Sequence, residues 1–231
     1  MQFSLTLLTN LLIFLNDEKD YGENTMKLKE YLNLFKKYLN KKIFTINEIS
    51  TLTNIDKKTL SVELNRLVKD GIIERVSKGV FINPFNKPSI EELASFLKYP
   101  SYISMEYALF VENVLPQAVY VVTLVTTSYP YVYHYKDYTF EYHHISKEFF
   151  FGFYKESNGV YIAYPEKALL DLIYIRYKKG KMNLERLESF IDDLYIEEID
   201  KNRLLEWGEI MGILPLLMNL KKVMQWFSVR K

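Results

Sequence analysis

The sequence contains no cysteine among its 231 residues. Disulfide bridges, thiolate metal sites and a cysteine nucleophile are therefore excluded, and this absence favours a cytoplasmic protein. Only three histidines are present. His143 and His144 are adjacent in a predicted strand, where neighbouring side chains point to opposite faces, so they are poorly placed to share one ion. We therefore predict no metal site, and we assign no cofactor.

Long hydrophobic runs are also lacking. The most apolar stretch lies within residues 1–25, but it is too short to span a bilayer, and it has neither the basic start nor the small-residue cleavage site of a signal peptide. We expect no membrane partner. Because a basic amphipathic helix opens directly at Met26, we interpret residues 1–25 as an N-terminal extension or as the product of a mis-assigned start.

The sequence has almost no net charge, yet its charges are unevenly distributed. The formal net charge is +1. Residues 27–83 hold 12 Lys or Arg against 6 Asp or Glu, a balance of +6, whereas residues 84–231 hold 17 against 19, a balance of −2. A basic segment favours binding to a polyanion such as nucleic acid, so this activity is expected in the first part of the chain.

Residues 45–84 have the pattern of a winged helix-turn-helix. Thr45 and Glu48 form a capping box, which predicts a helix that begins directly after the threonine. Asn54 is suited to end this helix in the left-handed conformation, and Asp56 is suited to cap a second one. Two short helices joined by a tight turn are therefore expected.

The second predicted helix, residues 57–70, has one apolar and one polar face. Its leucines and a valine recur at i, i+4, i+7 and i+8, so one stripe is expected to be buried. The opposite face is centred near Val62 and carries side chains that can bond base edges and phosphates in a major groove. We interpret this helix as the recognition helix. Its predicted DNA-binding residues are Lys57, Lys58, Thr59, Ser61, Asn65, Arg66 and Lys69.

A β-hairpin with a basic tip follows the recognition helix. Arg75 and Lys78 lie near its turn, and we predict that they contact the DNA backbone or the minor groove as a wing. An amphipathic helix over residues 27–39, with Leu39 on its apolar face, completes a DNA-binding domain of residues 26–84. Charged faces are often only solvated, and helix-turn-helix folds also dock proteins, so protein docking is the alternative.

Residues 89–231 predict a second domain of mixed type. Prolines 84 and 88 interrupt regular structure and mark the boundary. Ser104 is suited to cap a helix, a buried strand is expected over residues 119–127, and two hairpins follow it. Helices continue from Pro165. The predicted fold class is α+β, a winged helix-turn-helix followed by a mixed domain with a small antiparallel sheet and C-terminal helices.

Several motifs of the second domain resemble the AbiEi family of antitoxins. The most specific is the run PEKALLDL at residues 165–172, supported by residues 102–116 and 140–153. The resemblance begins near Met26 and covers nearly all of the chain that follows. The residues that carry the family motif are Ser104, Gly152, Pro165, Glu166, Lys167 and Asp171.

This resemblance implies a toxin–antitoxin system of the kind used in phage defence. In similar proteins the winged domain binds inverted repeats upstream of its own operon and represses it. The C-terminal domain opposes a toxin of the nucleotidyltransferase fold. We therefore expect a non-enzymatic antitoxin and repressor whose partners are double-stranded DNA and such a toxin encoded nearby.

Two other functions stay open at this point. The protein could be a stand-alone transcriptional regulator whose second domain senses a ligand or a partner, or a metal-dependent nuclease that uses Glu166, Lys167 and Asp171. Lys167 and Asp171 are four residues apart on one helix, and such pairs usually support a surface. We favour the interpretation that this helix start positions a surface for folding or for a partner.

Overall fold

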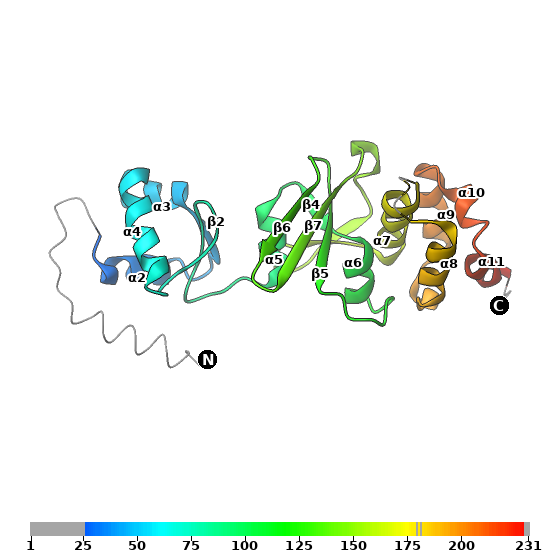
Figure 1. Ribbon diagram of the computed structural model, residues 1–231, viewed down its shortest axis with the longest axis horizontal. Coiled ribbons are helices and arrows are strands. Elements are labelled where there is room, and N and C mark those ends of the chain that lie inside the picture. Colours follow the sequence, from blue (N-terminus) through cyan, green and yellow to red (C-terminus); the bar gives the residue numbers. More distant parts are fainter. Residues whose placement is uncertain (1–25, 179, 181, 229–231) are drawn as a thin grey trace. The chain divides into compact units, whose positions relative to one another are not determined.

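The computed structural model describes residues 26–178, 180 and 182–228. The chain divides between Ser89 and Ile90 into two compact units, which we call the winged unit and the C-terminal unit (Figure 1). The interpretation of residues 1–25 concerns residues outside the described part. Within the described part, no helix is long and apolar enough to cross a membrane.

From residue 26 onward, the winged unit combines three helices with a three-stranded sheet. The strand order is β1-β3-β2, and both pairings are antiparallel. The predicted helices and the hairpin are confirmed, whereas the sequence pattern does not predict β1, because three residues are too few to show an alternation. The elements are α2 (Leu28–Lys37), β1 (Ile43–Thr45), α3 (Ile46–Thr53), α4 (Lys57–Lys69), β2 (Glu74–Ser77) and β3 (Val80–Ile82).

Apolar side chains from all three helices and the sheet form one core in the winged unit. Leu39 is not among them, and 49% of its surface is exposed. The prediction that it lies on a buried face is wrong, because α2 ends at Lys37 and the chain turns before Leu39 can point inward. The core consists of Tyr31, Leu32, Phe35, Phe44, Ile49, Leu60, Leu64, Leu67, Ile72, Ile73 and Phe81.

The C-terminal unit is built around a six-stranded sheet of order β6-β7-β5-β4-β9-β8. The two predicted hairpins are confirmed as β6/β7 and β8/β9. The sheet is nevertheless more mixed than expected, because β7 pairs in parallel with β5, and β9 pairs in parallel with β4. The strands are β4 (Ser101–Ile103), β5 (Val121–Thr126), β6 (Tyr131–Tyr135), β7 (Tyr138–His144), β8 (Phe153–Lys155) and β9 (Tyr161–Ala163).

Helices cover this sheet and confirm the α+β class. Helix α6 packs against β5 and α7, and α7 in turn packs against α9. The predicted buried strand is confirmed as β5, where Val122, Leu124 and Val125 have no exposed surface. Both faces of β5 are therefore covered. These helices are α5 (Ile90–Leu97), α6 (Met105–Val111), α7 (Pro165–Leu172), its π-helical continuation (Ile173–Lys178), α8 (Leu184–Asp192) and α9 (Lys201–Ile210).

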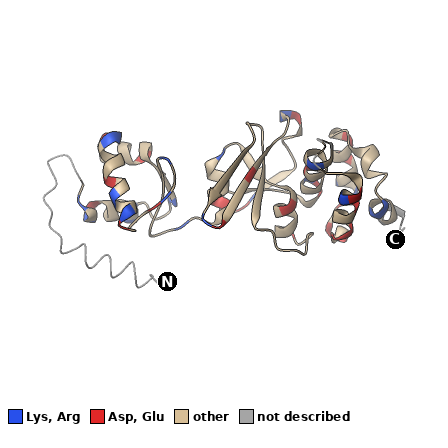
Figure 2. Cartoon of the chain, viewed as in Figure 1, with Lys and Arg blue, Asp and Glu red and all other residues tan. Residues whose placement is uncertain are grey.

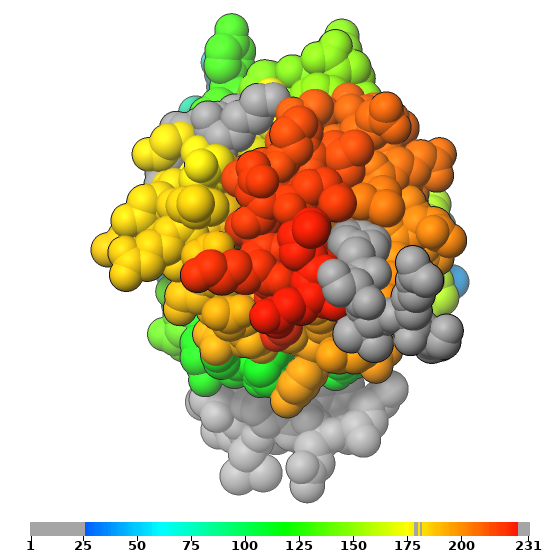
Figure 3. All heavy atoms as spheres, turned by 90° about the vertical axis from the view of Figure 1, so that its right-hand side faces the viewer, coloured from blue at the N-terminus to red at the C-terminus, as the bar shows by residue number. Residues whose placement is uncertain are grey.

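The last helices close one end of the C-terminal unit. A single helix is expected from the sequence over residues 216–227, but the structure forms α10 (Leu214–Leu217) and α11 (Lys221–Ser228). Figure 3 shows the face that these helices make with α8 and α9, with the red end of the colour scale at its centre. Short single-turn helices lie at Lys147–Phe149 and Ile196–Glu198.

Candidate nucleic-acid interface

Helix α4 is fixed at its start by its own sequence. The Asp56 carboxylate accepts hydrogen bonds from the backbone N–H groups of Lys58, at 2.8 Å, and Thr59, at 3.1 Å. Together with the Thr59 hydroxyl, these donors hold the pKa of Asp56 below its usual value. Asn54 ends α3 with a φ of 57°, in the left-handed region. The predicted capping of both helices is therefore confirmed.

The buried stripe of α4 determines which side chains face outward. Leu60, Leu64 and Leu67 lie in the core, so the opposite face is exposed and Val62, at its centre, is 71% exposed. None of the predicted DNA-binding residues of this helix is buried, although Lys57, its first residue, is in line with the buried stripe. Lys57, Lys58 and Lys69 are exposed, and Thr59, Ser61, Asn65 and Arg66 are half-buried.

Thr59 also takes part in capping α4, and this limits its predicted role in DNA binding. Its hydroxyl donates a hydrogen bond to the other carboxylate oxygen of Asp56, at 2.5 Å. The hydroxyl proton is thus already used in capping α4, and only the oxygen lone pairs face outward for a ligand. Among the predicted contacts on α4, Thr59 is therefore the least suited to donate to a phosphate.

The wing is anchored against the start of α3. Gly79 has a φ of 74°, and its carbonyl accepts a hydrogen bond from the Ile46 N–H at 2.8 Å. A Cβ at Gly79 would lie 3.1 Å from the Ile46 side chain, so this turn favours glycine on both counts. Lys78 is exposed at the tip, and the Arg75 guanidinium lies 5.4 Å from the Phe81 ring centroid. The predicted wing residues thus project from a hairpin whose position is fixed.

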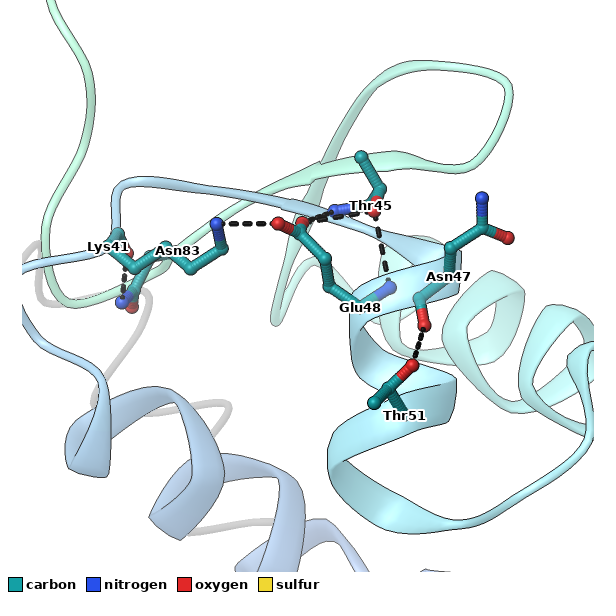
Figure 4. A network of polar contacts seen from close by, with 6 residues as sticks. All are labelled: Lys41, Thr45, Asn47, Glu48, Thr51 and Asn83. Carbon is teal, nitrogen blue, oxygen red and sulfur yellow. Dashed lines mark hydrogen bonds and ion pairs between the residues drawn. The ribbon is translucent and has the colours of Figure 1, made fainter.

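A polar network supports the junction between β1 and α3 (Figure 4). Glu48 completes the predicted capping box with Thr45 and also accepts a hydrogen bond from Lys41 Nζ at 2.8 Å. Partial burial alone would raise the pKa of Glu48, but the hydrogen bonds from Lys41 and Thr45 outweigh it and lower the pKa. Lys41 is therefore engaged within the unit, and its charge is partly neutralised.

Asn83 joins the end of α2 to the sheet, a role that sequence reasoning missed. Its side-chain amide is fully buried and donates to the backbone carbonyls of Phe35, Tyr38 and Lys41 at 2.9–3.2 Å. Its carbonyl oxygen accepts from the Phe85 N–H at 3.0 Å. The last carbonyl groups of a helix have no hydrogen-bond donors within the helix. Asn83, which follows β3 in the sequence, supplies such a donor at the end of α2.

One acidic side chain of α4 points away from the outward face. Glu63 is buried and accepts a hydrogen bond from the Tyr31 hydroxyl. Burial, followed by this contact with Glu63, raises the pKa of Tyr31 well above its usual value. Sequence reasoning missed Glu63, although its place directly beside Leu64 and the buried stripe is a signal. Its orientation leaves the outward face of α4 without a carboxylate between Lys57 and Lys69.

Basic side chains outnumber acidic ones on the winged unit, as expected from the sequence. Figure 2 shows Lys and Arg on α4 and on the wing. Since Glu63 is buried, one acidic charge is removed from the surface, whereas Glu48 and Lys41 largely neutralise each other there. The field around the outward face of α4 is therefore suited to attract a polyanion.

Four of the six motif residues of the C-terminal unit, Ser104, Glu166, Lys167 and Asp171, lie in its core, in contrast to the predicted surface. Lys167 and Asp171 have no exposed surface, and Glu166 is 2% exposed. Lys167 Nζ donates to Asp171 and, at 2.9 Å, to the Tyr102 hydroxyl. The interpretation of this helix start as a surface is wrong, because β4 and the chain before β8 cover it.

Asp171 is the centre of this buried network. Its Oδ2 accepts hydrogen bonds from the Tyr102 hydroxyl at 2.8 Å and from the Ser104 hydroxyl at 2.7 Å. Ser104 precedes α6 as predicted, but its hydroxyl makes no capping bond, because it donates to Asp171 instead. Burial lowers the pKa of Lys167, and Asp171 opposes this shift. The network therefore joins α7 to β4 through a paired charge.

The remaining motif residues shape the first turn of α7. Pro165 occupies its first position, as predicted. Glu166 accepts a hydrogen bond from the Asp200 N–H at 2.6 Å and lies 3.4 Å from the Arg203 guanidinium, so it holds the start of α9. Gly152 has a φ of 73°, and a Cβ there would lie 2.9 Å from the Lys167 side chain. The motif thus describes how α7 packs into this unit.

His143 and His144 point to opposite faces of their strand, as the alternation of side chains in a strand predicts. His143 is buried and His144 is exposed on β7. His143 lies 3.2 Å from Glu141, which also faces Arg176. In the described part of the chain, no three His, Cys, Asp or Glu side chains are grouped so that they could hold a metal ion.

A capped helix pair, an outward basic helix face and an anchored basic hairpin together define a winged helix-turn-helix fold. Residues 38–84 match the model of a family described as a transcriptional regulator, AbiEi antitoxin. The predicted resemblance to the AbiEi antitoxins is thereby confirmed for the winged unit, whereas the match does not extend to the motif at residues 165–172. A search of curated proteins found no match to the chain.

Proposed function

We propose that this protein is an antitoxin that represses its own toxin–antitoxin operon through the winged unit. Through the C-terminal unit it counteracts a nucleotidyltransferase-fold toxin encoded nearby. It acts in the cytoplasm and is not an enzyme. The observation that carries the proposal is the outward face of α4, which is basic, free of carboxylates and placed beside an anchored wing in a unit with an antitoxin-regulator match.

The burial of Lys167 and Asp171 supports the non-enzymatic role. A nuclease would need these side chains to reach a metal, a water and a phosphodiester. Both side chains have no exposed surface, and each is occupied by partners from β4 or α7. A role in holding the C-terminal unit together accounts for their contacts.

A salt-titrated binding assay on the DNA upstream of the protein's own gene tests the repressor role. We expect tight binding that falls steeply with salt, and weaker binding to scrambled DNA of equal length. Equal binding to both DNAs, or binding to neither, would contradict an operator-reading role. Rescue of growth from the neighbouring toxin gene by co-expression tests the antitoxin role separately.

Changing Arg66 or Asn65 to alanine should weaken binding to the upstream DNA by about 1–3 kcal/mol. It should also reduce the ratio of the affinity for upstream DNA to the affinity for scrambled DNA. The reason is that both side chains lie on the outward face of α4, where they can bond base edges. The measurement is a binding titration on both DNAs. Asn33→Ala, on the exposed face of α2, is the matched control and should change neither affinity.

Changing Lys78 to alanine should lower the affinity for all DNA sequences alike. It should also reduce the slope of log affinity against log salt by about 1, because a lysine at the wing tip neutralises a phosphate without reading a base. The exposed Lys29→Ala on α2 is the control. An unchanged salt slope for Lys78→Ala would remove the wing from the proposed interface.

A stand-alone regulator is a second candidate, supported by the family match being confined to residues 38–84. In that case the C-terminal unit senses a ligand or a partner rather than a toxin. The two candidates differ in one measurement. In an antitoxin, Arg66→Ala should weaken repression but preserve rescue from the toxin. In a stand-alone regulator, neither the unsubstituted protein nor the variant should rescue growth.

A further inference from the structure

Val62 occupies the centre of the outward face of α4 but has no role in the fold. It is 71% exposed, whereas the three leucines of α4 lie in the core and Val68 is half-buried. A β-branched residue also has a lower helix propensity than the lysines and leucines around it. Neither burial nor helix formation explains a valine at this position.

The neighbours of Val62 are polar or charged on every side. Residues three and four positions away on a helix are its nearest neighbours. For Val62 these are Lys58, Thr59, Asn65 and Arg66, which are all among the predicted DNA-binding residues. Exposed apolar side chains scattered over a protein surface are ordinary. This one is instead the apolar centre of a basic face.

We infer that Val62 packs against the 5-methyl group of a thymine when α4 lies in the major groove, and that it makes this base a determinant of the operator. The inference rests on the proposed function and names one feature of the DNA that it reads. The thymine methyl is the apolar group that base pairs present in the major groove, and a short apolar side chain is its complement. The surrounding cations supply the attraction to the phosphates.

The side chain is also of a suitable size and rigidity. Valine reaches only a short distance from the helix, so its contact requires the helix axis to lie close to the bases. Its χ1 angle is strongly restricted in a helix, so little rotamer freedom is lost on contact. Asn65 and Arg66, one turn further along α4, then reach the neighbouring bases.

The experiment is a two-by-two comparison of protein and DNA. The full chain and its Val62→Ala variant are titrated with the upstream DNA, prepared either with thymine or with deoxyuridine in place of every thymine. This replacement removes only the methyl groups. Leu52→Ala is the matched control, because Leu52 is another exposed apolar residue, 40% exposed, but lies on α3. Circular dichroism verifies that each variant is folded.

For the unsubstituted protein, we expect deoxyuridine DNA to bind about fourfold more weakly for each methyl group contacted. Val62→Ala should bind thymine DNA with a similar loss and should discriminate little between the two DNAs. Leu52→Ala should keep the full discrimination.

Two results would overturn the inference. Val62→Ala could retain the full preference for thymine DNA, or the unsubstituted protein could bind both DNAs equally. Either result leaves the repressor role intact if the upstream DNA is still preferred over scrambled DNA. Absence of any preference for the upstream DNA would instead contradict the proposed function and this inference together.

Discussion

Lys167→Ala should lower the free energy of unfolding of the C-terminal unit by about 3–5 kcal/mol. The substitution leaves the Asp171 carboxylate buried without its cation, and removal of one partner from a buried ion pair is costly for this reason. Tyr102 and Ser104 would still donate to Asp171, but neither carries a compensating charge. The loss is therefore expected to be among the largest of any single substitution in this unit.

Tryptophan fluorescence during urea unfolding measures this effect. Both tryptophans of the protein, Trp207 and Trp226, lie in the C-terminal unit, so the signal reports that unit alone. Lys147→Ala, which removes an exposed lysine of the same unit, should change the unfolding free energy by less than about 0.5 kcal/mol. A comparably small loss for Lys167→Ala would show that the pair is solvated and that the network does not support the fold.

The same substitution separates a structural role from a catalytic one. If Lys167 held a substrate or a metal-bound water, its removal would abolish an activity and leave stability nearly unchanged. The contacts of Lys167 instead predict a loss of stability, with DNA binding by the winged unit preserved. The binding titration on upstream DNA therefore serves as the internal control for this variant.

Asn83→Ala should destabilise the winged unit by about 1–3 kcal/mol. The variant removes a side-chain donor from three backbone carbonyls, of which that of Phe35 lies in a buried site and is left without this partner. Amide hydrogen exchange in α2 and β1 should become faster, because the carbonyls of Phe35, Tyr38 and Lys41 all lie at the junction of these elements. Tryptophan fluorescence of the C-terminal unit should be unaffected.

Asn86→Ala is the matched control for Asn83. Asn86 also donates to a backbone carbonyl, that of Leu39, at 2.7 Å, but this bond is exposed to water. Water can replace the lost donor there, so only a small change in exchange is expected. Equal effects of the two substitutions would contradict the role assigned to burial.

Local signals in the sequence were sufficient to predict where α3 and α4 of the winged unit begin. The capping box of Thr45 and Glu48, and the cap at Asp56, form between residues at most three positions apart. Such contacts depend little on the rest of the chain. The buried stripe of α4 is equally local, since helical periodicity alone places Leu60, Leu64 and Leu67 on one face.

Prediction from the sequence failed where a side chain contacts a partner from a distant segment of the chain. The spacing of Lys167 and Asp171 correctly places them on one face of a helix, but spacing does not reveal whether another element covers that face. Tyr102 lies 65 residues from Lys167 in sequence and contacts it in the core. Glu63 was missed for the same reason, because its partner Tyr31 lies 32 residues away.

The sequence by itself determined the order of the helices and the hairpin, the outward face of α4 with Val62 at its centre, and the excess of basic charge in residues 27–83. Each follows from residue types and from periodicities of a few residues. Only the tertiary structure decided that β7 lies between β6 and β5, that Asn83 closes the end of α2, and that Lys167 and Asp171 lie in a core. These features depend on contacts between segments far apart in the chain, and local patterns carry no information about which segments meet.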